Sequence, residues 1–193
     1  MGRPREFSEA AALDAAMRVF WERGYEGTSI DDLTAAMGIN RSSLYASFGD
    51  KEALFRRVLD HYAAGPMAFL NEALQLPTAR GVLEALFRGT VTFLGDPNHP
   101  RGCLSLQGGL ACGTGVESVQ QTMVACRKSS IQRLQERLEQ ARKQGDLPRD
   151  VNPKDLARYA AIVMNGLSVQ AANGATRAEM NRAVDLALRC LPI

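Results

Sequence analysis

The segment R-S-S-L-Y-A-S, from Arg41 to Ser47, carries side chains suited to hydrogen bonding with a nucleic acid. If it is helical, Leu44 and the following Phe48 face inward, and the guanidinium, hydroxyl and phenol groups face outward. Most outward residues are small or polar, so the helix backbone could approach base edges closely. The segment therefore offers candidate base and phosphate contacts, provided that a neighbouring element presents it at the surface.

Two short helices around a glycine turn are expected to present this segment. Ser29 can cap the first helix, and Gly38 ends it because glycine accepts the left-handed conformation past a helix end. Asn40 can cap the second helix, Arg41 to Phe48, which Gly49 ends. This is a helix-turn-helix, whose second helix can enter the DNA major groove. An ordinary αα-hairpin has the same outline, so the pattern alone leaves both interpretations open.

Residues 15–55 closely resemble the N-terminal DNA-binding domain of TetR/AcrR-type transcriptional repressors. The chain satisfies three patterns of that domain: F-x-x-x-G-Y-x-x-T-[ST], D-L-x-x-x-x-G-[IV] and L-Y-x-x-F-x-x-K-x-x-L. The resemblance is strong over roughly the first 60 residues and extends to the remaining two-thirds only in layout. It implies a transcriptional repressor whose partner is double-stranded operator DNA.

The resemblance also implies which residues touch DNA. The phosphate contacts would be Thr28, Tyr45 and Lys51, and the residues facing bases or the groove floor would be Arg41, Ser42, Ser43 and Ala46. Ala46 stands where many relatives carry a larger residue, so hydrogen-bond readout is not expected there, whereas contact with a thymine methyl remains open. Residues 1–62 contain eight Lys/Arg and ten Asp/Glu, so recognition should depend on a few placed groups rather than on a basic surface.

Length and composition favour an all-α protein. The chain has 193 residues, of which 46% are hydrophobic and only 6% aromatic, and helix-forming residues dominate. The expected architecture is a three-helix helix-turn-helix domain over residues 1–52 and a helical ligand-binding and dimerisation domain over residues 53–193. Because the chain shows no long apolar run and no signal-peptide h-region, we expect a cytoplasmic protein without a membrane partner.

About nine helices are expected from apolar periodicity and capping residues. Their approximate ranges are 8–23, 30–37, 41–48, 51–76, 79–95, 103–112, 116–144, 153–174 and 177–191. The fourth range contains Gly65-Pro66, where a bend is expected. Trp21, in the first range, is assigned to the core of the N-terminal domain or to its junction with the second domain; ligand stacking is the alternative.

The last two expected helices carry apolar residues on two faces, which indicates packing on two sides. The TetR/AcrR resemblance implies a two-fold homodimer through a four-helix bundle of these helices, which would present two recognition helices to a palindromic operator. The expected dimer contacts are Tyr159, Val163, Leu167, Val184 and Leu188. The alternative is that the second apolar face belongs to the core of a monomer.

The four cysteines, Cys103, Cys112, Cys126 and Cys190, form no C-x-x-C pair, so neither a metal site nor a cofactor is expected. One interpretation makes them small buried hydrophobic residues. The other interpretation makes Cys103 a thiol sensor. It follows Arg101-Gly102 at the expected start of a helix, and both a nearby arginine and a helix N-terminus favour the reactive thiolate form. G-C-L here also resembles a branch of the TetR/AcrR family in which some members sense electrophiles or oxidants through cysteine.

A pocket for a non-covalent inducer is expected among the middle helices of the second domain. Its candidate wall residues are Phe87, Val91, Cys103, Gln107, Met123, Cys126 and Met164. Each of them also fits plain core packing. Walls of this kind suit a hydrophobic or weakly polar molecule, with few charges to hold an anion, and they do not identify the inducer.

No catalytic constellation is visible. The chain has two histidines, His61 and His99, and no Ser-His-acid set, P-loop, H-E-x-x-H or G-x-G-x-x-G. The prediction is therefore a homodimeric repressor, and not an enzyme, that a small apolar ligand or cysteine modification releases from DNA. The alternatives are a helical dimerisation or scaffold protein without DNA binding, and a small helical enzyme that uses the body cavity.

Overall fold

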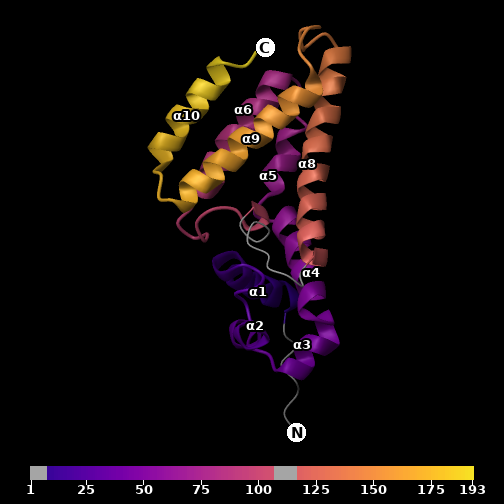
Figure 1. The fold of residues 1–193 in the computed structure, drawn as a ribbon, viewed down its shortest axis with the longest axis vertical. Coiled ribbons are helices and arrows are strands. Elements are labelled where there is room, and N and C mark those ends of the chain that lie inside the picture. Colours follow the sequence, from indigo (N-terminus) through magenta and orange to yellow (C-terminus); the bar gives the residue numbers. More distant parts are fainter. Residues whose placement is uncertain (1–7, 107–116) are drawn as a thin grey trace.

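The structure is a computed structural model that describes residues 8–106 and 117–193. Every regular element in these two ranges is a helix, which confirms the all-α prediction. The helices are α1 (Glu9–Arg23), α2 (Ile30–Met37), α3 (Arg41–Phe48), α4 (Lys51–Ala64), α5 (Ala68–Ala73), α6 (Ala79–Leu94), α8 (Glu117–Lys143), α9 (Pro153–Ala172) and α10 (Arg177–Arg189). The molecule is elongated, with α1, α2 and α3 at one end and α6, α9 and α10 towards the other (Figure 1).

Side-chain caps set the limits of α2 and α3, and these limits agree with the predicted ones. Ser29 Oγ accepts the Asp32 N–H at 3.0 Å, and the Asp32 carboxylate accepts the Ser29 N–H at 2.9 Å. These hydrogen bonds, with that from the Ser29 hydroxyl first, lower the pKa of Asp32 to about 2. Gly38 takes a left-handed φ of 66°, and Asn40 Oδ1 then accepts the Ser43 N–H at 2.8 Å to start α3.

An aromatic cluster joins α1 to the beginning of α4. Phe55 is fully buried, and its ring centroid lies 4.9 Å from that of Phe20 and 5.1 Å from that of Tyr25, both in edge-on geometry. The expected boundary between residues 52 and 53 lies within α4, whose next turns complete this cluster. We call α1, α2, α3 and residues 51–58 of α4 the head, and the rest of the chain the body.

The expected single helix over residues 51–76 is two helices. α4 ends at Ala64, and the separate α5 begins at Ala68. Pro66 is the reason, because it has no N–H to donate and disfavours helical geometry at the preceding Gly65. The predicted bend is therefore a break, after which α5 packs against α6.

The body is built around α6, α8, α9 and α10. α9 packs against α8 and α6, and α10 packs against α6. Fully buried side chains from several of these helices, including Leu83, Phe87, Leu138 and Val184, form the body core. Of the helix expected over 103–112, residues 104–106 are helical, and Gln107 and Cys112 lie outside the described residues. No helix in the described ranges is both long and apolar enough to cross a membrane.

Trp21 links the head to the body. Its ring lies edge-on to Tyr62 of α4 at 5.0 Å and stacks on Phe93 of α6 at 5.5 Å. Its indole N–H donates to the Gly102 carbonyl oxygen at 3.2 Å, across 81 residues of sequence. The junction assignment made for Trp21 is therefore confirmed, and the same contacts couple α1 to the loop that precedes Cys103.

Candidate functional site

The recognition helix α3 has one inner side and one open side. Leu44 and Phe48 are buried and hold it to the head core. Arg41, Ser42 and Ala46 are exposed, and the Tyr45 side chain is 49% exposed. The structure therefore brings these predicted DNA contacts together on a single open surface at the tip of the molecule (Figure 1).

Arg41 at the start of α3 is held by Asp31 of α2. The guanidinium donates from Nη2 to both carboxylate oxygens at 2.7 and 2.8 Å and from Nε to one of them at 2.9 Å. The hydrogen bonds that Arg41 donates to Asp31 raise the pKa of Arg41, which stays charged. Both side chains are mostly exposed, so the pair adds little stability and can exchange for a DNA contact.

Two of the expected phosphate contacts sit in different surroundings. Lys51 is half-buried, with its Nζ 4.4 Å from the centroid of the Tyr25 ring, and burial lowers its pKa. Thr28 is buried, and its hydroxyl donates to the Gly24 carbonyl oxygen at 2.7 Å. The Thr28 side chain therefore stabilises the turn before α2, and the structure does not present it on the open surface with Tyr45.

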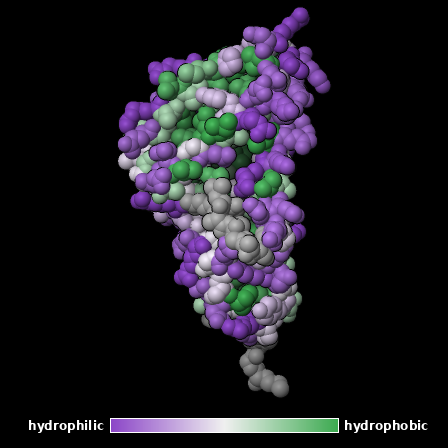
Figure 2. Space-filling model, viewed as in Figure 1, coloured by the Kyte–Doolittle hydropathy of each residue, from purple (hydrophilic) through white to green (hydrophobic). Residues whose placement is uncertain are grey.

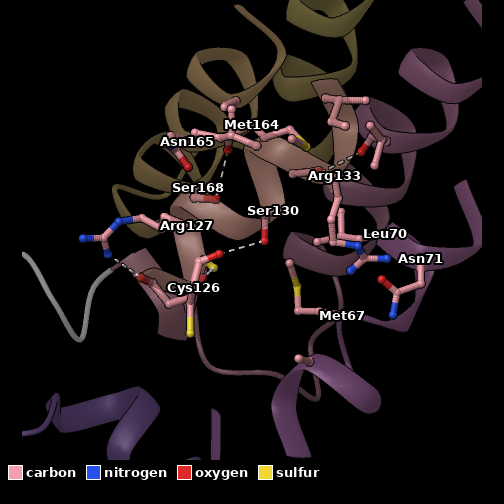
Figure 3. A pocket seen from close by; sticks show the side chains of 18 of the residues that line it. Met67, Leu70, Asn71, Cys126, Arg127, Ser130, Arg133, Met164, Asn165 and Ser168 are labelled. Carbon is pink, nitrogen blue, oxygen red and sulfur yellow. Dashed lines mark hydrogen bonds between the residues drawn. The ribbon is translucent and has the colours of Figure 1, made fainter. Parts of the chain in front are cut away.

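A cavity of about 230 Å³ opens in the body between α4, α5, α6, α8 and α9 (Figure 3). Apolar side chains make most of its wall, among them Tyr62, Leu70, Phe93 and Met164. α5 contributes Leu70 and Asn71, which sequence reasoning missed because it continued the fourth helix through this point. The Gly65-Pro66 pair was the available signal for the turn that brings α5 to the cavity.

The predicted wall residues divide into two groups. Cys103, Cys126 and Met164 line the cavity. Phe87, Val91 and Met123 do not: Phe87 and Val91 are buried in the body core, and Met123 is fully buried in the cluster that continues from the head. Their assignment to the cavity wall is therefore wrong, because periodicity marks a helix face as apolar without telling whether another helix or a void covers it. Gln107 lies outside the described residues.

The cavity wall is also more charged than expected. Arg127 and Arg133 of α8 both belong to it, whereas few charges were predicted. The Arg127 guanidinium donates to the Ser105 carbonyl oxygen at 2.8 Å. Figure 3 shows Arg133, on the other side of the cavity, reaching toward Leu70 and Asn71. The positively charged groups therefore lie on opposite sides of a mainly apolar space.

Cys103 is buried where the cavity meets the junction between head and body. Its Sγ lies 3.3 Å from the Tyr62 hydroxyl and 3.0 Å from the Ser105 hydroxyl. Burial, and then the contact with Cys103, raises the pKa of Tyr62, so the phenol stays neutral and available for this hydrogen bond. Tyr62 also contacts Trp21 of α1. A group added to the Cys103 sulfur would therefore displace Tyr62 and disturb the contact between α1 and the body.

The outer face of α9 and α10 differs from the predicted dimer contacts. Leu167, Val184 and Leu188 are buried in the body core, and Val163 is half-buried against it, so the three buried residues offer no surface to a partner. The exposed apolar residues are instead Tyr159, Ile162, Val169 and Leu186. Together with Gly166 they form the outer apolar stripe, and Figure 2 shows apolar side chains gathered over this part of the molecule. Of the predicted contacts, Tyr159 lies on this stripe.

Comparison with known proteins agrees with this architecture. Residues 12–58 match the bacterial regulatory proteins of the tetR family, and residues 77–187 match the tetracyclin repressor-like C-terminal domain. The HTH-type transcriptional repressor ComR of Escherichia coli K12 is 31% identical over 99% of this chain and 92% of its own length.

Solved structures show the same relationship. A cysteine mutant of the TetR family transcriptional regulator CifR, complexed with 26-base-pair operator DNA, is 41% identical and superposes with a TM-score of 0.93 over 98% of this chain and all of its own. A TetR regulator from Rhodococcus sp. RHA1 is 42% identical, with a TM-score of 0.64 over 94% of this chain and 97% of its own. The two matched regions together cover most of the chain, which therefore belongs to the TetR family of bacterial transcriptional regulators and is not an enzyme.

Proposed function

We propose that this regulator is a repressor that binds a palindromic operator as a homodimer and leaves it when the body cavity is occupied or Cys103 is modified. The proposal rests on the exposed face of α3, which carries Arg41, Tyr45 and Ala46, while the opposite face of the helix is buried against the head core. A DNA-bound CifR structure of the same fold supports a role for this surface in operator binding. We place the regulator in the cytoplasm with its DNA.

The homodimer is proposed to form through the outer apolar stripe. Its α9 residues recur at Tyr159, Ile162, Gly166 and Val169, a helical spacing of three and four that keeps them on one side. Four of the six large apolar side chains exposed in the described ranges lie on α9 and α10. A second copy of the chain would cover them and set the distance between two α3 helices.

We propose that a change in the position of α4 connects occupation of the cavity to release from DNA. This helix begins with Lys51 beside the recognition helix and reaches the cavity at Leu59 and Tyr62. An occupant of the cavity that fits one position of α4 better than another would shift the dimer toward that position. The division of labour that we propose is DNA binding by residues 1–52 and ligand binding with dimerisation by residues 53–193.

Tyr45→Ala and Lys51→Ala are each expected to weaken operator binding roughly tenfold, because each removes one phosphate contact. The measurement is a titration of DNA fragments flanking the gene with purified protein at low salt. Lys51→Ala should also make the affinity less dependent on salt. Lys143→Ala, which removes an exposed charge at the far end of α8, is the control and should bind as wild type. Absence of any bound palindrome would contradict the repressor proposal.

Cys103→Ser is expected to abolish release of the operator by a thiol alkylating agent such as iodoacetamide. Alkylation forms a carbon–sulfur bond and expels iodide and the thiol proton, and the added group should displace the Tyr62 and Ser105 hydroxyls from the sulfur. Release is followed by fluorescence anisotropy of labelled operator. Cys126→Ser is the matched control and should be released like wild type, because it leaves Cys103 and its contacts with Tyr62 and Ser105 intact. Equal release of both variants would remove Cys103 as the sensor.

A further inference from the structure

We propose that the body cavity binds a small amphipathic carboxylate, with its apolar part in the space between Tyr62, Phe93 and Met164 and its carboxylate at Arg133 and Asn71. The proposal rests on the cavity being the inducer site of the proposed function, and it adds the chemical class of the ligand.

The charged side chains of the cavity wall are all positive. The described residues that line it include two arginines and no aspartate, glutamate, lysine or histidine. Arg127 is already engaged with the Ser105 carbonyl oxygen, whereas Arg133 makes no hydrogen bond or ion pair with any described residue. Figure 3 shows the Arg133 side chain extending toward Asn71 of α5. The unpaired positive charge therefore lies at the α5 side of the cavity.

A second guanidinium strengthens the positive field on this side. Arg137, one helical turn beyond Arg133, donates to the carbonyl oxygens of Leu74, Leu76 and Pro77. Its Nη1 is buried without a partner among the described residues, and no described carboxylate pairs with it. Two neighbouring guanidinium groups without a counter-ion disfavour a cationic ligand nearby and favour an anionic one.

Three hydroxyl groups of the cavity wall are not free to donate to a ligand. Thr90, Ser130 and Ser168 each donate to a carbonyl oxygen of their own helix, at 2.7, 3.1 and 3.0 Å. Their hydroxyl hydrogens are therefore committed, and the Arg133 guanidinium and the Asn71 amide are the donors left for a ligand on the α5 side. A planar carboxylate can accept two parallel hydrogen bonds from such a guanidinium.

The volume limits the size of the ligand. A cavity of about 150 Å³ accommodates benzene, so 230 Å³ admits a molecule of roughly nine non-hydrogen atoms. Octanoate has about this size and carries its charge at one end. Octanol and octylamine share its chain and differ in charge, which makes the three compounds a direct probe of the headgroup.

The test is calorimetric titration of the full-length protein, without DNA, with octanoate, octanol and octylamine at neutral pH. Octanoate is expected to bind at least about tenfold more tightly than the other two, as hydrogen bonds between charged partners imply. Arg133→Gln should remove this preference by weakening octanoate alone, while Arg142→Gln, an exposed arginine on the same helix outside the cavity wall, should leave it intact.

Three results would overturn the proposal. The first is binding of octanol or octylamine as tight as that of octanoate, since Tyr62 and Phe93 could hold an alkylammonium by cation–π contact. The second is an unchanged octanoate affinity in a folded Arg133→Gln protein. The third is absence of binding by all three compounds. Operator binding by the ligand-free protein tests the repressor proposal separately, so failure of one does not imply failure of the other.

Discussion

Replacing Ile162 with aspartate is expected to turn the proposed homodimer into monomers and to weaken operator binding by about a hundredfold or more, since one of two half-site contacts is lost. The Ile162 side chain is 63% exposed and stands in the middle of the outer apolar stripe, between Tyr159 and Gly166. Two-fold symmetry brings the same substitution to both subunits, so the interface would have to bury two unpaired carboxylates at about 3–5 kcal/mol each. A monomer presents one recognition helix and loses the second half-site.

Sedimentation velocity and operator titration would measure both effects on the same sample. Ser129→Asp adds the same charge to an exposed position of α8 and should remain dimeric. Circular dichroism should show that the Ile162→Asp chain keeps its helices, because Ile162 contributes nothing to the body core. A dimeric Ile162→Asp protein would mean that the stripe is not the subunit interface.

Phe55→Ala is expected to destabilise the head by about 3–5 kcal/mol, the usual cost of emptying a fully buried aromatic site. Phe55 is fully buried, and it packs edge-on against both Phe20 and Tyr25. The cavity left behind would separate α4 from α1, so operator binding should fall together with stability. Urea unfolding followed by Trp21 fluorescence reports the change, because Trp21 lies at the junction that depends on α1.

Tyr45→Ala is the matched control for this stability effect. It removes an aromatic ring from the same head, but the Tyr45 side chain is half exposed and lies outside the head core. Its unfolding free energy should stay within about 0.5 kcal/mol of wild type, even though its operator affinity falls. Equal stability of Phe55→Ala and wild type would show that the aromatic cluster does not hold the head together.

Local signals were enough to predict the head. Ser29, Gly38 and Asn40 act on backbone groups within four residues of themselves, so helix limits set by these residues can be read along the chain. The recognition face of α3 follows from the same short range, because Leu44 and Phe48 are one turn apart. Thr28 is the exception, because its hydroxyl donates to the Gly24 carbonyl oxygen only four residues away, whereas the family resemblance assigned it to a phosphate.

The two-sided apolar pattern of α9 and α10 shows the limit of this approach. Periodicity indicated apolar residues on two faces of both helices, but it could not tell the inner face from the outer one. Val184 and Leu188 proved to face the body core, whereas Ile162 and Leu186 proved to be exposed. The choice depends on the angle at which each helix meets α6, which is set by packing between residues far apart in the sequence.

By itself, the sequence determined the helical class, the limits of α2 and α3, the candidate recognition residues and the family, because caps, periodicity and motif spacing act over a few residues. The tertiary structure alone decided where the cavity lies, that Arg133 and Asn71 both line it, and that Cys103 contacts Tyr62, which in turn packs against Trp21. These arrangements join α4, α5, α8 and the loop before Cys103, and such long-range contacts arise only when the helices pack.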